Sequence, residues 1–370
     1  MSETTDPTPT TQDHEFDVKA RTQAQLVVRR FLHHRLAMIS LVVLVLMALL
    51  AFAGARVWGY DHARIPQNNL ESYNAPSLTK PAGRCRPIET VAVPTNTDPG
   101  VTTTVDRLAP APTTTIAGAT GDTGDWRADF IAKYPRDHDL SCAPHLFGTN
   151  QVGQDLFAQT LRGTQRSLLI AIMVAIVSTT LGVLIGAAAG FFRGWLDAVL
   201  MRMTDLILTV PYLAVAAVLG RKVSGDTWWV IPLILGGFGW MGIARIIRGE
   251  FLSLREKEFV EAARASGATS KRIIFKHMLP NAVGPIIVNA TLSVAGAILA
   301  ETALSFLGLG VKSPDVSLGS LVSENQTAFS THPWLFWFPG LFIIVIVLCV
   351  NFIGDGLRDA FDPKQNRVRA

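Results

Sequence analysis

Six apolar runs divide this chain, and each is close to or above the roughly 20 residues with which a helix crosses a bilayer. We predict membrane spans at about residues 36–58, 167–191, 196–219, 228–247, 282–304 and 334–354. Polar segments separate the runs, and the longest of these lies between the first run and the second. The pattern therefore predicts an all-α polytopic membrane protein with six transmembrane helices.

The composition supports a membrane protein. Hydrophobic residues make up 49% of the 370 residues and charged residues 17%, whereas a soluble domain holds roughly 25% charged residues. The net charge of +4 is expected where Lys and Arg collect on the cytoplasmic side, so it gives no reason to expect nucleic acid as a partner. Residues 1–18 are polar, which predicts a disordered tail and no cleavable signal peptide there.

The distribution of Lys and Arg among the loops predicts the orientation of the chain. Residues 245–276 hold eight such side chains, whereas the loop after the fifth run holds only Lys312. We therefore expect a cytoplasmic N-terminal tail, an extracytoplasmic segment, a five-helix core and a cytoplasmic C-terminal tail, at residues 1–35, 59–166, 167–354 and 355–370.

The expected extracytoplasmic segment carries two of the three cysteines, Cys85 and Cys142. Disulfides persist on the oxidising side of a membrane, so these two could pair and close the segment, with two free thiols as the alternative. Residues 95–125 between them are rich in Thr, Pro, Gly and Asp. Such low complexity predicts loose structure.

Two features of the runs concern the packing and shape of the helices. Glycines recur at every fourth position of the second run, at Gly182, Gly186 and Gly190. This spacing lets two helices approach closely, and a merely flexible glycine-rich helix is the alternative. Pro211 lies inside the third run, where we expect it to kink the helix.

Two acidic residues lie at or near membrane depth, where acids are costly and tend to face the interior of a helix bundle. Arg202 lies three residues before Asp205, so we expect a local ion pair. For Glu301 we find no local partner, and two roles stay open: facing a central pathway, or capping a bent helix end. A proton relay would need a chain of His, Asp and Glu through the runs, which the sequence lacks.

Residues 258–281, EFVEAARASGATSKRIIFKHMLPN, form the longest strongly charged segment between two apolar runs. An alanine-rich first helix is interrupted by Gly267. A second short helix, capped by Thr269 or Ser270, runs toward Pro280. Its apolar face consists of Ile273, Ile274 and Met278. A docking site at the membrane surface and an ordinary solvated loop both fit this pattern.

Several kinds of chemistry are absent from the sequence. It has no GxxxxGK[ST] phosphate-binding loop, no cluster of zinc ligands and no GxSxG elbow. We therefore expect neither an enzyme nor a metal site in this chain.

The charged segment matches the spacing of the EAA loop of ABC-importer permeases. The matching residues are Glu261, Ala262, Ala263, Gly267, Leu279 and Pro280. His277 stands at the isoleucine position of that loop, and in this departure the segment resembles the peptide-permease branch. Residues 145–170, 301–314 and 338–364 resemble that branch in the same order. The chain thus resembles the C-type permease of oligopeptide and dipeptide ABC importers, which implies the type I ABC importer permease fold in a bacterial inner membrane.

The resemblance implies that the chain imports short peptides together with several partners. These are a homologous second permease that completes the pathway, two ATPase subunits that carry ATP and Mg, and an extracytoplasmic substrate-binding protein; no cofactor is implied in this chain. The segment at residues 255–281 would be a coupling hairpin seated in a groove of an ATPase subunit. The residues implied in coupling are Glu258, Glu261, Ala262, Ala263, Gly267, Lys271, Leu279 and Pro280.

One segment departs from the resemblance. Residues 78–144 look additional to the family pattern, and Cys85 and Cys142 lie close to the two ends of this insertion. That placement favours a disulfide-closed outer module, which would contact the binding protein or cover the mouth of the pathway.

Other functions remain as alternatives. Nickel, haem or another small cargo is compatible with the same motifs. A proton-coupled secondary transporter would have an internal repeat and a chain of membrane acids, neither of which we find. A scaffold or channel without an ATPase would leave the match at the hairpin unexplained.

Overall fold

The computed structural model describes residues 23–54, 76, 93–94, 102–103, 145–222, 228–312 and 315–362. Within these, five helical segments are long and apolar enough to cross a membrane: Arg35–Gly54, Leu156–Phe192, Val230–Arg255, Val283–Phe306 and Trp334–Phe361. The first combines α2 (Arg35–Leu49) with the π-turn η1 (Leu50–Gly54), and the others are α5, α8, α12 and α14. A bent pair, α6 (Gly194–Thr209) and α7 (Tyr212–Lys222), makes a sixth crossing if it forms one broken span. The predicted all-α membrane architecture is confirmed.

The helices extend beyond the predicted spans at several ends. For example, α5 begins eleven residues before the predicted position 167, at Leu156, because Asp155 caps it: the Asp155 Oδ1 accepts a hydrogen bond from the Ala158 amide at 2.7 Å. Likewise α8 runs on to Arg255 and α14 to Phe361. Hydropathy marks the part of a helix that lies in lipid, whereas caps and polar contacts set where the helix ends.

The predicted kink in the third run is confirmed. Helix α6 ends at Thr209, α7 begins at Tyr212, and their axes differ by 71°. Pro211 lies in the break. A proline lacks the amide hydrogen that would continue the helix, and its ring clashes with the preceding turn.

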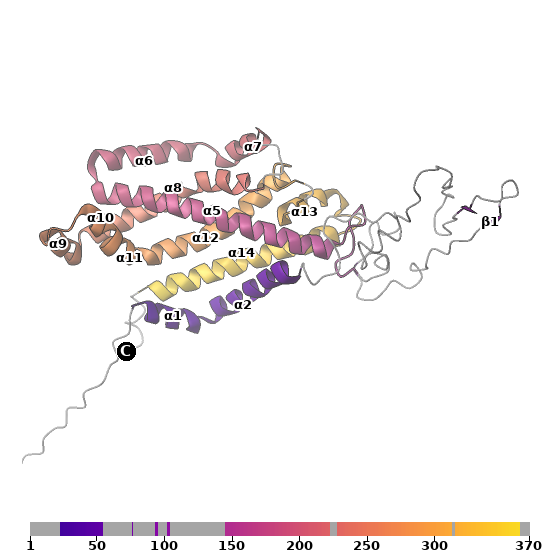
Figure 1. Ribbon diagram of the computed structural model, residues 1–370, viewed down its shortest axis with the longest axis horizontal. Helices are drawn as coiled ribbons and strands as arrows, with labels where there is room; N and C mark the ends of the chain where they lie inside the picture. The colour runs from indigo at the N-terminus through magenta and orange to yellow at the C-terminus, as the bar shows by residue number, and fades with distance from the viewer. Residues whose placement is uncertain are drawn as a thin grey trace, which may run out of the picture.

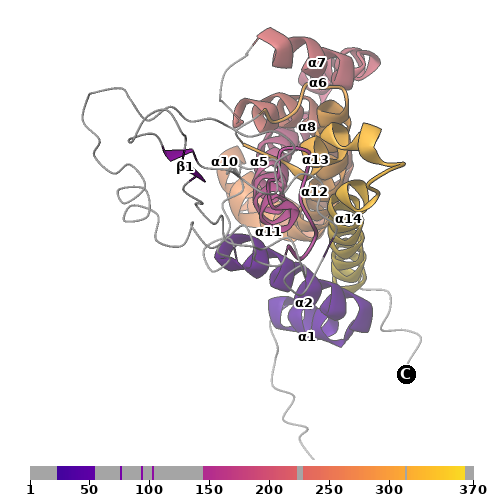
Figure 2. The same ribbon diagram turned by 90° about the vertical axis from the view of Figure 1, so that its right-hand side faces the viewer.

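The helices run alongside one another in a single bundle (Figure 1). Helix α5 packs against α8 and α12, and α14 packs against α12 and α2. The short helix α1 (Gln23–His33) contacts the end of α14, where the Arg30 guanidinium donates to the Asp362 carbonyl oxygen at 3.3 Å. Turned by 90°, the bundle shows α6 and α7 on one side and α1 with α2 on the other (Figure 2).

The two ends of the bundle differ. Helices α9 (Glu258–Ala265), α10 (Ser270–Arg272) and α11 (Leu279–Asn281) lie at one end, together with α1 and the last turns of α14 (Figure 1). We call this the hairpin end. The opposite, far end carries the start of α5 and the short helix α13 (Leu318–Glu324), which is followed by the 3₁₀ turn η5 (Gln326–Ala328).

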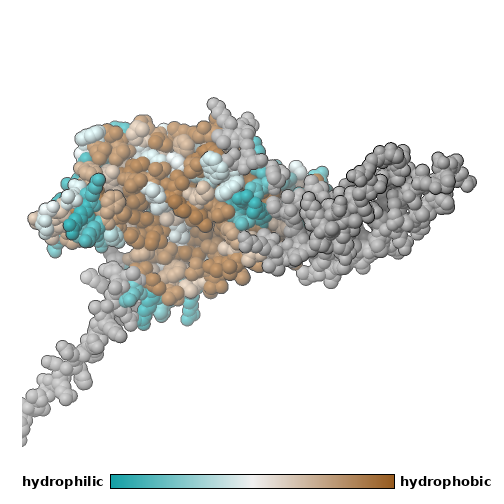
Figure 3. Space-filling view, viewed as in Figure 1, coloured by the Kyte–Doolittle hydropathy of each residue, from teal (hydrophilic) through white to brown (hydrophobic). Residues whose placement is uncertain are grey.

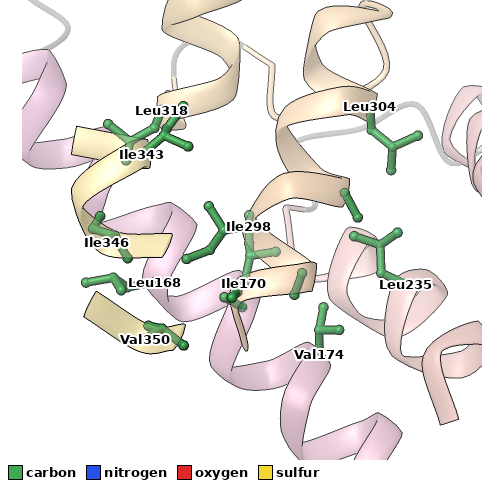
Figure 4. Packing of buried hydrophobic residues seen from close by; sticks show 14 of the residues in the cluster. Leu168, Ile170, Val174, Leu235, Ile298, Leu304, Leu318, Ile343, Ile346 and Val350 are labelled. Atoms are coloured by element: carbon green, nitrogen blue, oxygen red, sulfur yellow. The ribbon is translucent and has the colours of Figure 1, made fainter. Parts of the chain in front are cut away.

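Buried apolar side chains from α5, α8, α12, α13 and α14 form the core (Figure 4). Ile170 of α5, Ile298 of α12 and Ile346 of α14 have almost no exposed surface. Around the middle of the bundle the outer surface is largely hydrophobic, while hydrophilic residues gather at the hairpin end and in a second patch toward the far end (Figure 3). This is the surface expected of a bundle whose middle faces lipid.

Most of the predicted insertion lies outside the described residues. Within it, β1 (Val93–Pro94) and β2 (Thr102–Thr103) pair antiparallel, with Val93 opposite Thr103. Both cysteines of the expected disulfide, Cys85 and Cys142, fall outside the described residues. The third, Cys349, is a buried free cysteine within α14.

Candidate functional site

The charged segment folds as the predicted hairpin. Its first arm is α9, and its second arm runs through α10, the π-turn η4 (Ile273–Met278) and α11 into α12. Thr269 caps the second arm, because its hydroxyl oxygen accepts a hydrogen bond from the Arg272 amide. Of the two caps considered from the sequence, Thr269 is the one used.

Gly267 makes the turn between the two arms. Its φ is +75°, in the left-handed region that side chains with a Cβ disfavour. The Gly267 amide donates to the Arg264 carbonyl and the Ala268 amide to the Ala263 carbonyl, at 2.9 and 3.0 Å. This pair of bonds is a Schellman motif, which ends α9 and sets the direction of the second arm.

The second arm departs from the ordinary helix that the sequence predicts. Between Ile273 and Met278 it is a π-helix, in which the Leu279 amide donates to the Ile274 carbonyl, five residues back. Pro280 explains the wider turn, because its ring clashes with the carbonyl four residues earlier in a regular helix. The Asn281 side-chain amide donates to the His277 carbonyl at 2.6 Å and so satisfies one oxygen of this turn.

One face of the hairpin is anchored on the helix ends. Val260, Ile273 and Met278 are buried. They pack in a cluster with Phe191 at the end of α5 and Phe251 near the end of α8. The predicted apolar face is therefore confirmed, and it points into the protein.

The other face is open. Most residues of the EAA match are exposed, and Ala263 and Leu279 are half-buried against the anchoring cluster. The exposed residues of the predicted site are Glu258, Glu261, Ala262, Gly267, Lys271 and Pro280. Two large apolar side chains share this exposure: Phe275 is 60% exposed and Phe259 38%. A charged face that also presents aromatic rings is suited to binding a protein partner.

The row of glycines in α5 lies against α8. A Cβ placed on Gly182 would lie 2.7 Å from the Ile243 Cβ, and one on Gly190 would lie 2.8 Å from the Arg248 carbonyl oxygen. A Cβ on Gly186 would meet the Ala244 carbonyl oxygen. The absence of side chains at these positions allows the two backbones to touch, so the hairpin rests on a closely packed pair of helices.

Ion pairs join α6 to α8. Arg248 binds the Asp197 carboxylate through two nitrogens, and Arg245 pairs with Asp205. The expected local pair of Arg202 with Asp205 is wrong. The facing helix brings Arg245 to the carboxylate, an arrangement that spacing along α6 alone does not reveal.

Where α5 meets α6, Arg193 has a φ of 56° and a ψ of −165°. It is the one non-glycine residue with positive φ in the described part of the chain. Its guanidinium pairs with Glu256, two residues before the start of α9, and Arg255 donates to the Phe191 carbonyl at 2.6 Å. The turn between α5 and α6 is thus tied to the base of the hairpin.

Glu301 has no exposed surface. Its Oε1 accepts hydrogen bonds from the hydroxyls of Ser305 at 2.7 Å and Ser317 at 2.6 Å, and its Oε2 accepts one from Ser167 at 3.2 Å. The expectation that Glu301 lacks a local partner is wrong, because Ser305 lies one helical turn further along α12. A fully buried carboxylate also does not face an open pathway in this conformation.

Other charged groups gather at the far end. Arg162 and Arg166 of α5 both pair with Asp315, and the Arg166 guanidinium lies 4.7 Å from the centre of the Trp228 ring.

Among the residues that the structure describes, no group of three or more His, Cys, Asp or Glu side chains is placed to hold a metal ion.

A family described as "binding-protein-dependent transport system inner membrane component" matches residues 182–367. The chain belongs to this family. The match includes the glycine row, the hairpin and Glu301, so these features all lie in the shared permease region. The family described as "N-terminal TM domain of oligopeptide transport permease C" matches residues 22–80, which include α1 and α2.

Individual relatives agree with this membership. This permease is similar to the oligopeptide transport system permease protein OppC of Mycobacterium tuberculosis, with 48% identity over 226 residues, 61% of this chain and 78% of that protein. The protein of the same name in Haemophilus influenzae is 42% identical over 230 residues, 61% of this chain and 74% of that one.

A solved structure also aligns with the permease. It is titled as inward facing conformations of the MetNI methionine ABC transporter, and the alignment has 19% identity and a TM-score of 0.46. It covers 55% of this chain and 96% of that chain.

Sequence reasoning missed the partners of the charged residues. Asp197 and Arg248 are 51 positions apart, and Ser167 is 134 positions from Glu301. Serines are common in membrane helices, so the three serines around Glu301 carry no signal of their own. The one available signal was the cost of an acid at membrane depth, which requires that polar partners lie nearby.

Proposed function

We propose that this chain is the membrane permease subunit of an ATP-driven importer of short peptides and forms half of its translocation pathway. Family membership supports the permease role. The names of the relatives from Mycobacterium tuberculosis and Haemophilus influenzae, oligopeptide transport system permease proteins, support peptides as the cargo.

The observation that carries the proposal is the two-faced hairpin. Its buried face, with Val260, Ile273 and Met278, is fixed to the ends of α5 and α8. Its open face presents the exposed rings of Phe259 and Phe275 among charged residues. A rigid element that is fixed on one side and open on the other can pass the movement of a bound partner into the membrane helices.

The partner that we propose for the open face is an ATPase subunit. Two such subunits, which carry ATP and Mg, drive the cycle because their open and closed states bind differently to two conformations of the permease pair. A homologous second permease completes the pathway. In this proposal the hairpin end and the N- and C-terminal tails lie in the cytoplasm, and the far end faces a substrate-binding protein outside the bacterial inner membrane.

Photo-crosslinking from single positions tests the docking face. With benzoylphenylalanine at Phe275, we expect a cross-link to an ATPase subunit in the assembled complex. The same residue at Phe329, which is 45% exposed but lies at the far end after η5, is the matched control and should give none. A cross-link to the ATPase from Phe329 and not from Phe275 contradicts the proposed orientation.

The cargo is tested separately in liposomes. With permeases, ATPases and binding protein reconstituted, labelled short peptides should accumulate only when ATP is on the ATPase side. Accumulation of Ni²⁺ or haem in place of peptides would retain the permease role and reject the cargo.

We further propose that residues 78–144 form an outer module closed by a Cys85–Cys142 disulfide. This proposal is supported by the position of the two cysteines near the two ends of the insertion, on the side of the membrane expected to be oxidising. Mass spectrometry of the unreduced protein should find one peptide pair linked through these cysteines. Detection of both as free thiols rejects the disulfide.

A further inference from the structure

The start of α13 is wedged between α5 and α12 at the far end of the bundle. Ser317 caps α13, with its hydroxyl oxygen accepting a hydrogen bond from the Ser320 amide at 3.1 Å. A Cβ on Gly163 of α5 would lie 3.0 Å from the Ser317 carbonyl carbon, and one on Gly319 would lie 2.7 Å from the Thr302 Cα of α12. The two glycines therefore let α13 enter between the helices.

The carboxylate of Glu301 connects these three elements. Ser167 lies on α5, Ser305 on α12, and Ser317 directly before α13. A serine hydroxyl has one hydrogen to donate, and each of the three donates it to Glu301. The Ser167 oxygen in turn accepts a hydrogen bond from the Leu318 amide at 3.1 Å, so the network holds both the cap and the first residue of α13.

Helix α12, which carries Glu301, continues directly from the hairpin. The hairpin ends in α11 at Asn281 and α12 begins at Val283, with only Ala282 between them. From Val283 to Glu301 the helix spans about 27 Å at 1.5 Å per residue. A displacement of the hairpin is therefore transmitted along the single helix α12 to the Glu301 carboxylate.

We propose that Glu301 is the positioning residue of a far-end clasp, made of Glu301, Ser167, Ser305 and Ser317, through which α12 moves α5 and α13 as one body. The clasp rests on the proposed function, because the coupling hairpin is the source of the movement. Its role is to transmit the conformational change of the ATPases to the far end of the pathway. Without it, α12 moves and α13 stays behind.

Four variants test the clasp in the assembled complex. Glu301→Ala removes the acceptor, Glu301→Gln keeps the shape and one acceptor oxygen, and Ser317→Ala removes one donor. Ser323→Ala is the matched control on the same helix, because the Ser323 hydroxyl makes only a 3.5 Å contact to the Phe306 carbonyl. Two quantities are measured: peptide transported per ATP hydrolysed, and the rate of hydrogen exchange in a peptide covering residues 315–325.

We expect Glu301→Ala to raise the exchange rate and lower the transport-to-ATP ratio, each by about tenfold, since the variant loses three hydrogen bonds and each contributes roughly 1 kcal/mol. Ser317→Ala and Glu301→Gln should give smaller changes in the same direction, and Ser323→Ala none. A clasp with a merely structural role would lower the yield of complex but leave the ratio unchanged.

An unchanged ratio in the Glu301→Ala complex overturns the proposal, whatever its exchange rate. If that complex does not assemble, wild-type ratios in both Glu301→Gln and Ser317→Ala overturn it. Failure of the proposed function is seen separately, as no peptide transport by the wild-type complex. In that case the hydrogen-exchange rates, which do not depend on transport, decide alone whether Glu301 holds α13 in place. Unchanged rates in the variants then overturn the clasp.

Discussion

A complex with Gly267→Val is expected to assemble in the membrane and hydrolyse ATP but to transport peptide poorly. Gly267 has a φ of +75°, and no atom outside its neighbours lies within 4 Å of a Cβ built on it. The effect thus comes from the backbone and not from a clash. A β-branched residue in the left-handed region costs about 2 kcal/mol or more, so the turn opens and the two arms no longer present one face.

Gly267→Asn is the matched control. Asparagine also adds a side chain to this open position, but it adopts the left-handed conformation more readily than valine. We expect the asparagine complex to keep most of its transport per ATP. The measurement is peptide uptake and ATP hydrolysis in the same liposomes. Normal transport per ATP in the Gly267→Val complex would contradict a role of Gly267 in coupling. Equal losses of transport per ATP in both variants would show that the effect comes from the docking surface and not from the turn.

The second large effect is expected where α5 meets α8. We expect Gly186→Ala to lower the free energy of unfolding of the isolated subunit by roughly 2–3 kcal/mol. The added methyl would lie 3.0 Å from the Ile247 Cβ and 3.1 Å from the Arg248 nitrogen. It would also overlap the Ala244 carbonyl oxygen. Backbone atoms cannot turn away as a flexible side chain can, so the helices must separate.

Two glycines of α8 provide the control. A Cβ on Gly237 or Gly242 would meet nothing within 4 Å. Because alanine favours a helix over glycine by about 1 kcal/mol, Gly237→Ala and Gly242→Ala should be neutral or slightly stabilising. Unfolding in mixed detergent and denaturant gives the comparison. A Gly186→Ala subunit as stable as these two would show that close contact of α5 with α8 is not required.

Local patterns were sufficient for the crossings and for the turn of the hairpin. The apolar runs indicate six crossings because lipid leaves the backbone few choices besides a helix. Pro211 predicts the break between α6 and α7 because its missing amide hydrogen is a property of that residue alone. Gly267 and Thr269 likewise carry their turn and cap chemistry in the sequence, and both act in the structure as that chemistry requires.

Other features depend on residues that meet only when the helices pack. The sequence shows Asp205 beside Arg202, yet the facing helix supplies Arg245. It shows an isolated acid at Glu301, yet serines on α5, α12 and the cap of α13 enclose it. It also indicates a regular second arm for the hairpin, whereas η4 is a π-turn.

Local sequence patterns thus determined that this protein is a polytopic helical membrane protein with a charged hairpin, because hydropathy, proline and glycine act over a few residues, and the resemblance of its motifs to a known family indicated a permease. Tertiary structure alone decided which face of the hairpin is buried and what binds Glu301. A buried carboxylate takes its donors from whichever helices packing brings to it. Those donors lie 4, 16 and 134 positions away along the chain.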